Sequence, residues 1–86
     1  MTLRLHPDVS AAYTGTGAVL LDQRTGRYWQ VNDTGAEVLR ALAATGSADR
    51  VADRLAEYYD VTPETIARDV AELLDALRAG GLLVSP

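Results

Sequence analysis

Apolar and polar residues alternate over two short stretches, 18–22 and 27–31, on either side of a polar segment that contains Gly26. A period of two is typical of strands, and the second stretch is rich in the aromatic and branched side chains that favour them. Gly26 supplies the positive φ that a tight hairpin turn requires. The pattern therefore predicts a hairpin in which Asp22 pairs with Arg27.

This pairing determines which side chains share a face of the hairpin. One face carries Ala18, Leu20, Trp29 and Val31. The opposite face carries Val19, Leu21, Tyr28 and Gln30. We expect the first face to pack against helices, because a sheet that is covered on one side buries its more apolar face.

Further along the chain, apolar residues recur at spacings of three and four, which predicts helices over 35–44, 48–59 and 63–79. The first of these helices is preceded by three residues that favour helix N-caps, Asn32, Asp33 and Thr34. Thr34 and Glu37 have the spacing of a capping box, so we expect the first helix to begin there.

The remaining segments complete the expected fold. Residues 3–5 alternate as a strand would, 10–17 form a loop of small residues with two glycines, and 82–84 are an apolar tail. The order of elements predicts one α+β domain over 1–86, with a three-stranded antiparallel sheet packed on three helices. The last two helices resemble a helix-turn-helix, so the whole is winged helix-turn-helix-like.

Composition narrows the function classes. The chain has no cysteine and one histidine, so we expect no metal site, no disulfide and no cofactor. All eight basic residues are arginine and the net charge is −4, which disfavours nucleic-acid backbones as partners. The sequence shows neither a signal peptide nor an apolar run of the roughly 20 residues that span a membrane, so we expect a cytoplasmic protein.

Candidates for catalysis are few. His6 is distant in sequence from every serine except Ser10, although sequence distance alone does not exclude a catalytic triad. Asp69, Glu72 and Asp75 share one face of the third helix, and most such faces are simply solvated. The same face suits an acidic rim that meets basic residues of a partner, whereas nothing indicates the burial that an acid–base pair needs. We therefore expect that the protein is not an enzyme.

The residues discussed above also follow an ordered family pattern, and the sequence resembles the PqqD-like family of leader-peptide recognition domains over 18–84. The pattern consists of Leu-Leu-Asp-x-x-Thr-Gly-Arg-Tyr-Trp-x-Val-Asn-x-Thr-Gly-Ala, Val-Ala-x-x-Leu-Ala, Tyr-Asp-Val, Asp-Val-x-x-Leu-Leu-x-x-Leu and Gly-Leu-Leu. No single motif is diagnostic, but the ordered set is fairly specific.

The resemblance implies that a precursor leader peptide adds as an antiparallel strand to the edge at 27–31 and lies against the third helix. On the strand, the implied peptide-binding residues are Arg27, Tyr28, Trp29, Gln30 and Val31. On the helix, they are Asp69, Val70, Glu72, Leu73, Ala76 and Leu77. Of these, Val70 and Leu77 fit the hydrophobic core equally well.

Within this family, the chain looks most similar to the stand-alone leader-binding proteins of split lasso-peptide systems. This likeness implies a leader with a Tyr-x-x-Pro-x-Leu motif. It also implies two protein partners, a transglutaminase-like leader peptidase and an ATP-dependent lasso cyclase.

Two other functions remain open. A winged-helix transcriptional regulator would use the helix at 63–79 to read DNA, but that helix carries four acidic residues against two arginines. A PqqD-like chaperone for another modified-peptide pathway would have the same sequence features, and the precursor's leader would distinguish it.

Overall fold

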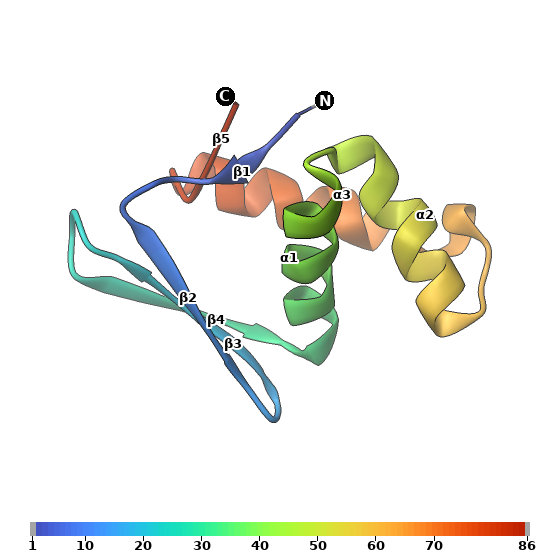
Figure 1. Ribbon diagram of the computed structural model, residues 1–86, viewed down its shortest axis with the longest axis horizontal. Helices are drawn as coiled ribbons and strands as arrows, with labels where there is room; N and C mark the ends of the chain where they lie inside the picture. Colours follow the sequence, from blue (N-terminus) through green and yellow to red (C-terminus); the bar gives the residue numbers. More distant parts are fainter. Residues whose placement is uncertain (1, 86) are drawn as a thin grey trace.

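Three antiparallel strands form the main sheet, in the order β2-β3-β4 (Figure 1). They are β2 (Val9–Thr14), β3 (Gly17–Asp22) and β4 (Arg27–Asn32). The computed structural model describes residues 2–85, and its register pairs Asp22 with Arg27 and Leu20 with Trp29. The predicted hairpin and its register are therefore confirmed, and Gly26 has the expected positive φ of 75°.

The third strand of this sheet is not the one that the sequence pattern indicated. The prediction of a loop over 10–17 is wrong, because most of these residues belong to β2, which pairs with β3 from Val9↔Asp22 to Thr14↔Gly17. Its small and polar side chains have little preference for strands, and pairing with the neighbouring strand overrides that weak local signal.

The predicted strand at 3–5 lies outside the main sheet. Two of its residues form β1 (Arg4–Leu5), which pairs antiparallel with β5 (Leu83–Val84), so segments near the two ends of the chain lie side by side (Figure 1). The apolar tail is thus a strand, and it forms a second, two-stranded sheet with β1.

The three predicted helices are present as α1 (Asp33–Thr45), α2 (Ala48–Tyr59) and α3 (Pro63–Ala79). The capping box expected at Thr34 and Glu37 is wrong. Asn32 caps α1, and its side-chain Oδ1 accepts a hydrogen bond of 2.9 Å from the backbone N–H of Gly35. Because Asn32 is also the last residue of β4, the helix begins directly at the end of the strand.

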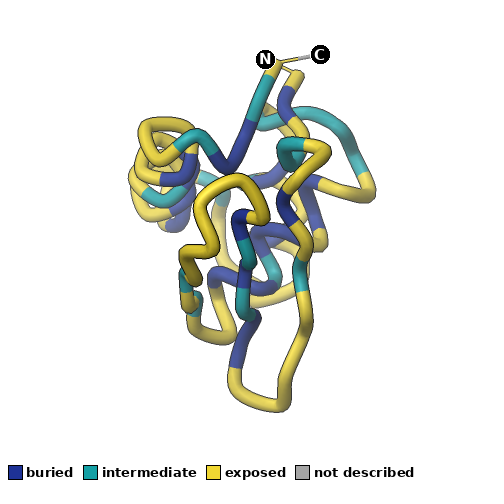
Figure 2. Tube along the Cα trace, turned by 90° about the vertical axis from the view of Figure 1, so that its left-hand side faces the viewer, coloured by how far each residue is buried: buried dark blue, intermediate teal, exposed yellow. Residues whose placement is uncertain are grey.

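The hydrophobic core lies between the sheet and the helices, and the exposed segments lie at the turns and outer faces (Figure 2). The inner face of the hairpin is the one predicted. Ala18 and Leu20 are buried and Trp29 and Val31 are partly buried, whereas Tyr28 on the opposite face is 69% exposed. The predicted α+β class, with three strands packed on three helices, is confirmed.

None of the helices described within residues 2–85 has the length and apolar character needed to cross a membrane.

Candidate functional site

One edge of the main sheet is open on the side of the helices. Among the described residues, β4 pairs with β3 alone, so its other edge has no partner strand. An antiparallel edge strand directs about half of its backbone N–H and C=O groups away from the sheet. All five strand residues of the predicted site, Arg27 to Val31, lie on this edge strand.

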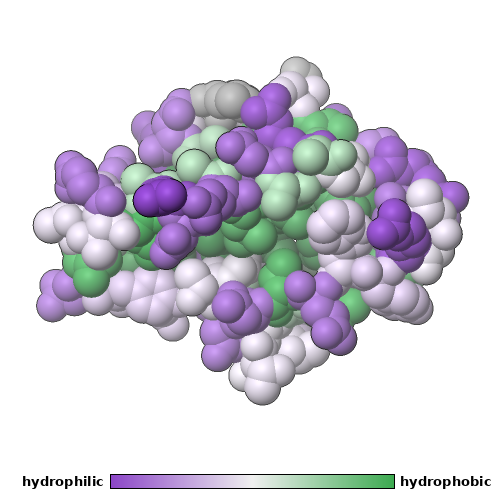
Figure 3. All heavy atoms as spheres, turned by 180° about the vertical axis from the view of Figure 1, so that it is seen from behind, coloured by the Kyte–Doolittle hydropathy of each residue, from purple (hydrophilic) through white to green (hydrophobic). Residues whose placement is uncertain are grey.

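A hollow of about 460 Å³ lies beside the Asn32 end of β4. Its walls come from the N-terminal half of α1 and from α3, which face each other across it. The hollow is lined by Asn32, Thr34, Gly35, Val38, Ile66, Asp69, Val70, Glu72 and Leu73. From behind, hydrophobic residues form a band across the middle of the surface, between hydrophilic residues (Figure 3).

Four of the six helix residues predicted for the site line this hollow. Asp69 and Glu72 stand exposed at its rim, Leu73 is half-buried in its wall, and Val70 is largely buried in its floor. Ala76 and Leu77 are not among the lining residues. Ala76 is exposed further along α3, and Leu77 is 1% exposed and belongs to the core.

The contribution of α1 was missed by sequence reasoning. Thr34, Gly35 and Val38 line the hollow opposite α3. A Cβ added to Gly35 would lie 2.7 Å from the Cβ of Val31, so this glycine lets the start of α1 pack closely on β4. The sequence offered one signal of this close packing, namely a glycine in the first turn of a helix that directly follows a strand.

The other end of β4 contacts the C-terminal end of α3. The ring of Trp29 lies over Gly80, where an added Cβ would be only 2.7 and 2.8 Å from the ring carbons Cζ2 and Cη2. The strand therefore contacts the end of α3 near Trp29, and reaches the hollow near Asn32. It follows that α3 runs opposite to β4. We call the surface from the edge of β4 to α3, with the hollow at its Asn32 end, the groove.

A second hollow, of about 620 Å³, is larger but less suited to an extended peptide. It lies along α2, and its lining is mostly charged: Thr45, Arg50, Asp53, Arg54, Glu57 and Tyr58. No residue of the sheet lines it, so it offers no strand edge. We therefore assign the candidate site to the groove between β4 and α3.

The chemistry of this groove is that of a binding surface. It combines unpaired backbone groups on β4, an apolar wall, and carboxylates at the rim, of which Glu72 accepts a hydrogen bond from Arg68 at 3.3 Å. Within residues 2–85, no group of three or more histidine, cysteine or acidic side chains is arranged to hold a metal ion.

Comparison with known proteins identifies the family of this chain. Residues 17–83 match the family described as coenzyme PQQ synthesis protein D (PqqD). No curated protein matches the sequence.

Two solved structures are similar over nearly the whole chain. One is a lasso peptide synthetase B1 complexed with the leader peptide, with a TM-score of 0.83 and 39% identity over 98% of this chain and 99% of that one. The other is TbiB1 in complex with the TbiA(beta) leader peptide, also with a TM-score of 0.83, and with 26% identity over 93% of each chain. The family match covers most of the sequence, the fold agrees with both structures, and the chain therefore belongs to the PqqD family.

Proposed function

We propose that this protein is a non-catalytic recognition protein that binds the leader of a lasso-peptide precursor in the groove between β4 and α3. The observation that carries the proposal is the free edge of β4 beside a hollow with apolar side chains in its floor and carboxylates at its rim. The two similar structures, both solved with leader peptides, support it.

In this proposal the leader adds as an antiparallel strand to residues 27–31. Main-chain hydrogen bonds to the edge contribute affinity, and side chains that enter the groove contribute specificity. Because the added strand runs opposite to β4, its N-terminal part lies at the hollow and its C-terminal part leaves past Trp29. In a Tyr-x-x-Pro-x-Leu motif, proline and leucine are two residues apart and share one face of a strand.

The acidic rim gives the groove a preference for basic leader residues. Asp69 and Glu72 are exposed, so each ion pair with the leader contributes at most about 1 kcal/mol. The apolar wall around Leu73 then supplies most of the side-chain contribution.

We further propose that the protein acts in the cytoplasm as a single domain and delivers the bound leader to a transglutaminase-like leader peptidase and an ATP-dependent lasso cyclase. Nothing in the groove favours the DNA-binding alternative, since its helical wall presents Asp69 and Glu72.

The test is calorimetric titration with a synthetic leader that carries the Tyr-x-x-Pro-x-Leu motif. We expect sub-micromolar, one-to-one binding that is lost when the tyrosine or leucine of the peptide becomes alanine. Leu73→Arg should weaken binding by at least about 30-fold, the loss typical of a central interface residue. The fold should be retained, because the arginine stem can lie along the wall with its charge in water.

Ala71→Arg is the matched control. Ala71 lies on the same helix but lines a different hollow, with Leu3 and Ala48. The control should bind the leader as the wild type does. A folded wild type that does not bind would refute recognition of a lasso-type leader and move the function to another peptide class or to DNA, whereas full binding by Leu73→Arg would refute only the assignment of the groove.

A further inference from the structure

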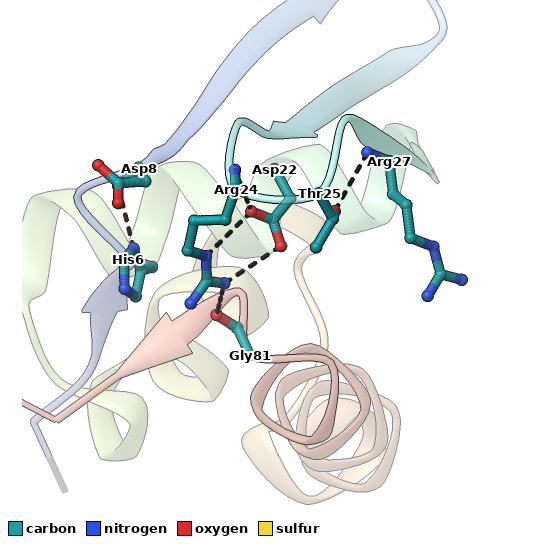
Figure 4. A network of polar contacts seen from close by, with 7 residues as sticks. All are labelled: His6, Asp8, Asp22, Arg24, Thr25, Arg27 and Gly81. Atoms are coloured by element: carbon teal, nitrogen blue, oxygen red, sulfur yellow. Dashed lines mark hydrogen bonds and ion pairs between the residues drawn. The ribbon is translucent and has the colours of Figure 1, made fainter.

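The side chain of Arg24 joins the turn between β3 and β4 to the C-terminal end of α3. Arg24 donates from Nε to Oδ1 of Asp22 at 3.0 Å and from Nη2 to Oδ2 at 3.1 Å (Figure 4). The same Nη2 donates to the backbone carbonyl oxygen of Gly81 at 2.8 Å. Asp22 ends β3 and Gly81 follows α3, so Arg24 links the end of β3 to the end of α3 by a bond to a residue 57 positions further along the chain.

The acceptor of this link is held in place by the turn itself. Asp22 is 4% exposed, and its Oδ1 also accepts from the backbone N–H of Arg24 at 3.0 Å. Its carbonyl oxygen accepts from the N–H of Gly26 at 2.8 Å. The hydrogen bonds from Arg24 lower the pKa of Asp22, so the carboxylate stays charged and holds the guanidinium as a planar, two-bonded pair.

A second contact lies at Gly80, the residue before Gly81 at the end of α3, which the ring of Trp29 covers. Gly81 itself has a φ of 76°, which glycine adopts without strain, and this turns the chain out of the helix. The pair Gly80-Gly81 thus does more than end α3, because it receives both the ring of Trp29 and the guanidinium of Arg24. We call the set of Asp22, Arg24, Trp29, Gly80 and Gly81 the hairpin–helix clamp.

The clamp stands at one end of the groove and the hollow at the other. Trp29 contacts the end of α3, whereas Asn32, three residues further along β4, lines the hollow with Leu73. Arg24 is outside the hollow and precedes the strand to which the leader would add. Any effect of Arg24 on peptide binding through these contacts must therefore pass through the position of β4 relative to α3.

We propose that Arg24 is a positioning residue that, through the hairpin–helix clamp, holds the edge of β4 at a set distance from α3 and so forms the groove before the peptide arrives. This inference rests on the proposed function. A preformed groove binds more tightly, because less conformational freedom is lost on association. The sequence indicated no such role, since Arg24 appears there as one polar residue of a turn.

The test compares Arg24→Gln with Arg40→Gln. Arg40 is a matched control, because it is also an exposed arginine with one acidic partner, Glu37, and its loss changes the net charge equally. It lies over the ring of Tyr13 and does not line the hollow. In titrations with the leader, we expect Arg24→Gln to weaken binding about tenfold, and Arg40→Gln to stay within about twofold of the wild type.

Amide hydrogen exchange of the free protein gives a readout that general destabilisation would not mimic. We expect faster exchange in β4 and around Gly80 in Arg24→Gln, with unchanged exchange in α2. With saturating leader, the exchange of β4 should return to the wild-type rate, because the peptide then holds the edge in place. Uniformly faster exchange over the whole chain would instead assign Arg24 to overall stability and overturn the proposal.

Arg24→Lys separates geometry from charge. A lysine ammonium keeps the charge but cannot form the two-bonded pair and reach Gly81 in the same plane, so we expect intermediate binding. Wild-type affinity in Arg24→Lys, together with a loss in Arg24→Gln, would assign the effect to charge and overturn the positioning role. Should Arg24→Gln not fold, Arg24→Lys and its exchange pattern carry the test.

The two proposals fail in different ways. Absence of leader binding by the wild type refutes the proposed function, and the positioning role with it. Normal binding by the wild type and by Arg24→Gln refutes the positioning role and leaves leader recognition intact.

Discussion

The carboxylate of Asp22 lies buried at the end of β3, at the point where the main sheet meets the end of α3. Burial alone would raise its pKa, but the hydrogen bonds from Arg24 outweigh it and lower the pKa, with His6 contributing in the same direction. The charge is therefore stable in the folded state because Arg24 provides a partner with two donors.

Asp22→Asn tests this residue through the pH dependence of stability. Because the pKa is lower in the folded protein, the carboxylate contributes stability that is fully present above its pKa in the unfolded chain, which is about 4. That contribution is lost as the pH falls further, toward the folded pKa. We expect Asp22→Asn to be less stable at pH 7, because the amide NH₂ would face the guanidinium, and to lose less stability than the wild type below pH 4.

Urea unfolding at pH 7 and in steps below pH 4 measures both effects. Asp53→Asn, which removes an exposed carboxylate on α2, is the control for the lost negative charge and should keep the wild-type free energy of unfolding at pH 7. An Asp22→Asn curve parallel to the wild-type curve would contradict the role of this carboxylate.

At the scale of elements, the groove depends on how β4 passes into α1. Asn32 ends the strand and caps the helix, and Gly35 in the first turn packs against Val31 of the strand. The helix is thereby held against the strand that precedes it, and its first residues form a wall of the hollow. Such a short connection leaves no freedom to adjust, so the fit at Gly35 determines where α1 lies.

Gly35→Ala tests this fit, because the sign of its effect on the free energy of unfolding depends on whether a Cβ can be accommodated at Gly35. On an unhindered helix, alanine stabilises by about 0.5–1 kcal/mol relative to glycine. Here the new Cβ would lie 2.7 Å from the Cβ of Val31, which cannot rotate away, so we expect a loss of about 1–3 kcal/mol in the free energy of unfolding. We also expect weaker leader binding, measured by titration.

Gly15→Ala is the control for this substitution. Apart from its chain neighbours, no residue has an atom within 4 Å of a Cβ added there, at the turn between β2 and β3. Its free energy of unfolding should differ from that of the wild type by less than about 0.5 kcal/mol. A stabilised Gly35→Ala variant would show that α1 can move away from β4.

At the scale of the whole molecule, the two ends of the chain close the structure. β1 and β5 pair with each other, and the backbone N–H of His6 donates to the carbonyl oxygen of Leu82 at 2.8 Å. Leu82 is fully buried and adjoins the hairpin–helix clamp in sequence. The C-terminal tail is therefore part of the core that supports the end of α3.

Leu82→Ala should lower the free energy of unfolding by about 2–5 kcal/mol, as large-to-small core substitutions do. We expect unfolding to remain cooperative, so that the fluorescence of Trp29 and the far-ultraviolet circular dichroism change at the same urea concentration. Val84→Ala, at a partly exposed position of β5, should cost less. Separate transitions for the two signals would show that the tail and α3 unfold independently of the sheet.

The local pattern of the sequence determined the elements that depend on neighbours along the chain. The hairpin, its register and its inner face followed from alternation around Gly26, and the three helices followed from apolar spacing. The family pattern likewise identified the PqqD family. These features were accessible because turn geometry and periodicity are local properties.

Only the tertiary structure decided what lies between those elements. β2 became a strand by pairing with β3, and Asn32 rather than Thr34 capped α1 because the helix starts at the end of β4. The groove required α3 to return beside β4, and Arg24 found its acceptor at Gly81 only through that return. The family resemblance had implied the α3 wall of the hollow, but contacts between residues far apart in the sequence leave no periodic signal, and so its α1 wall and the hairpin–helix clamp could be read only from the folded chain.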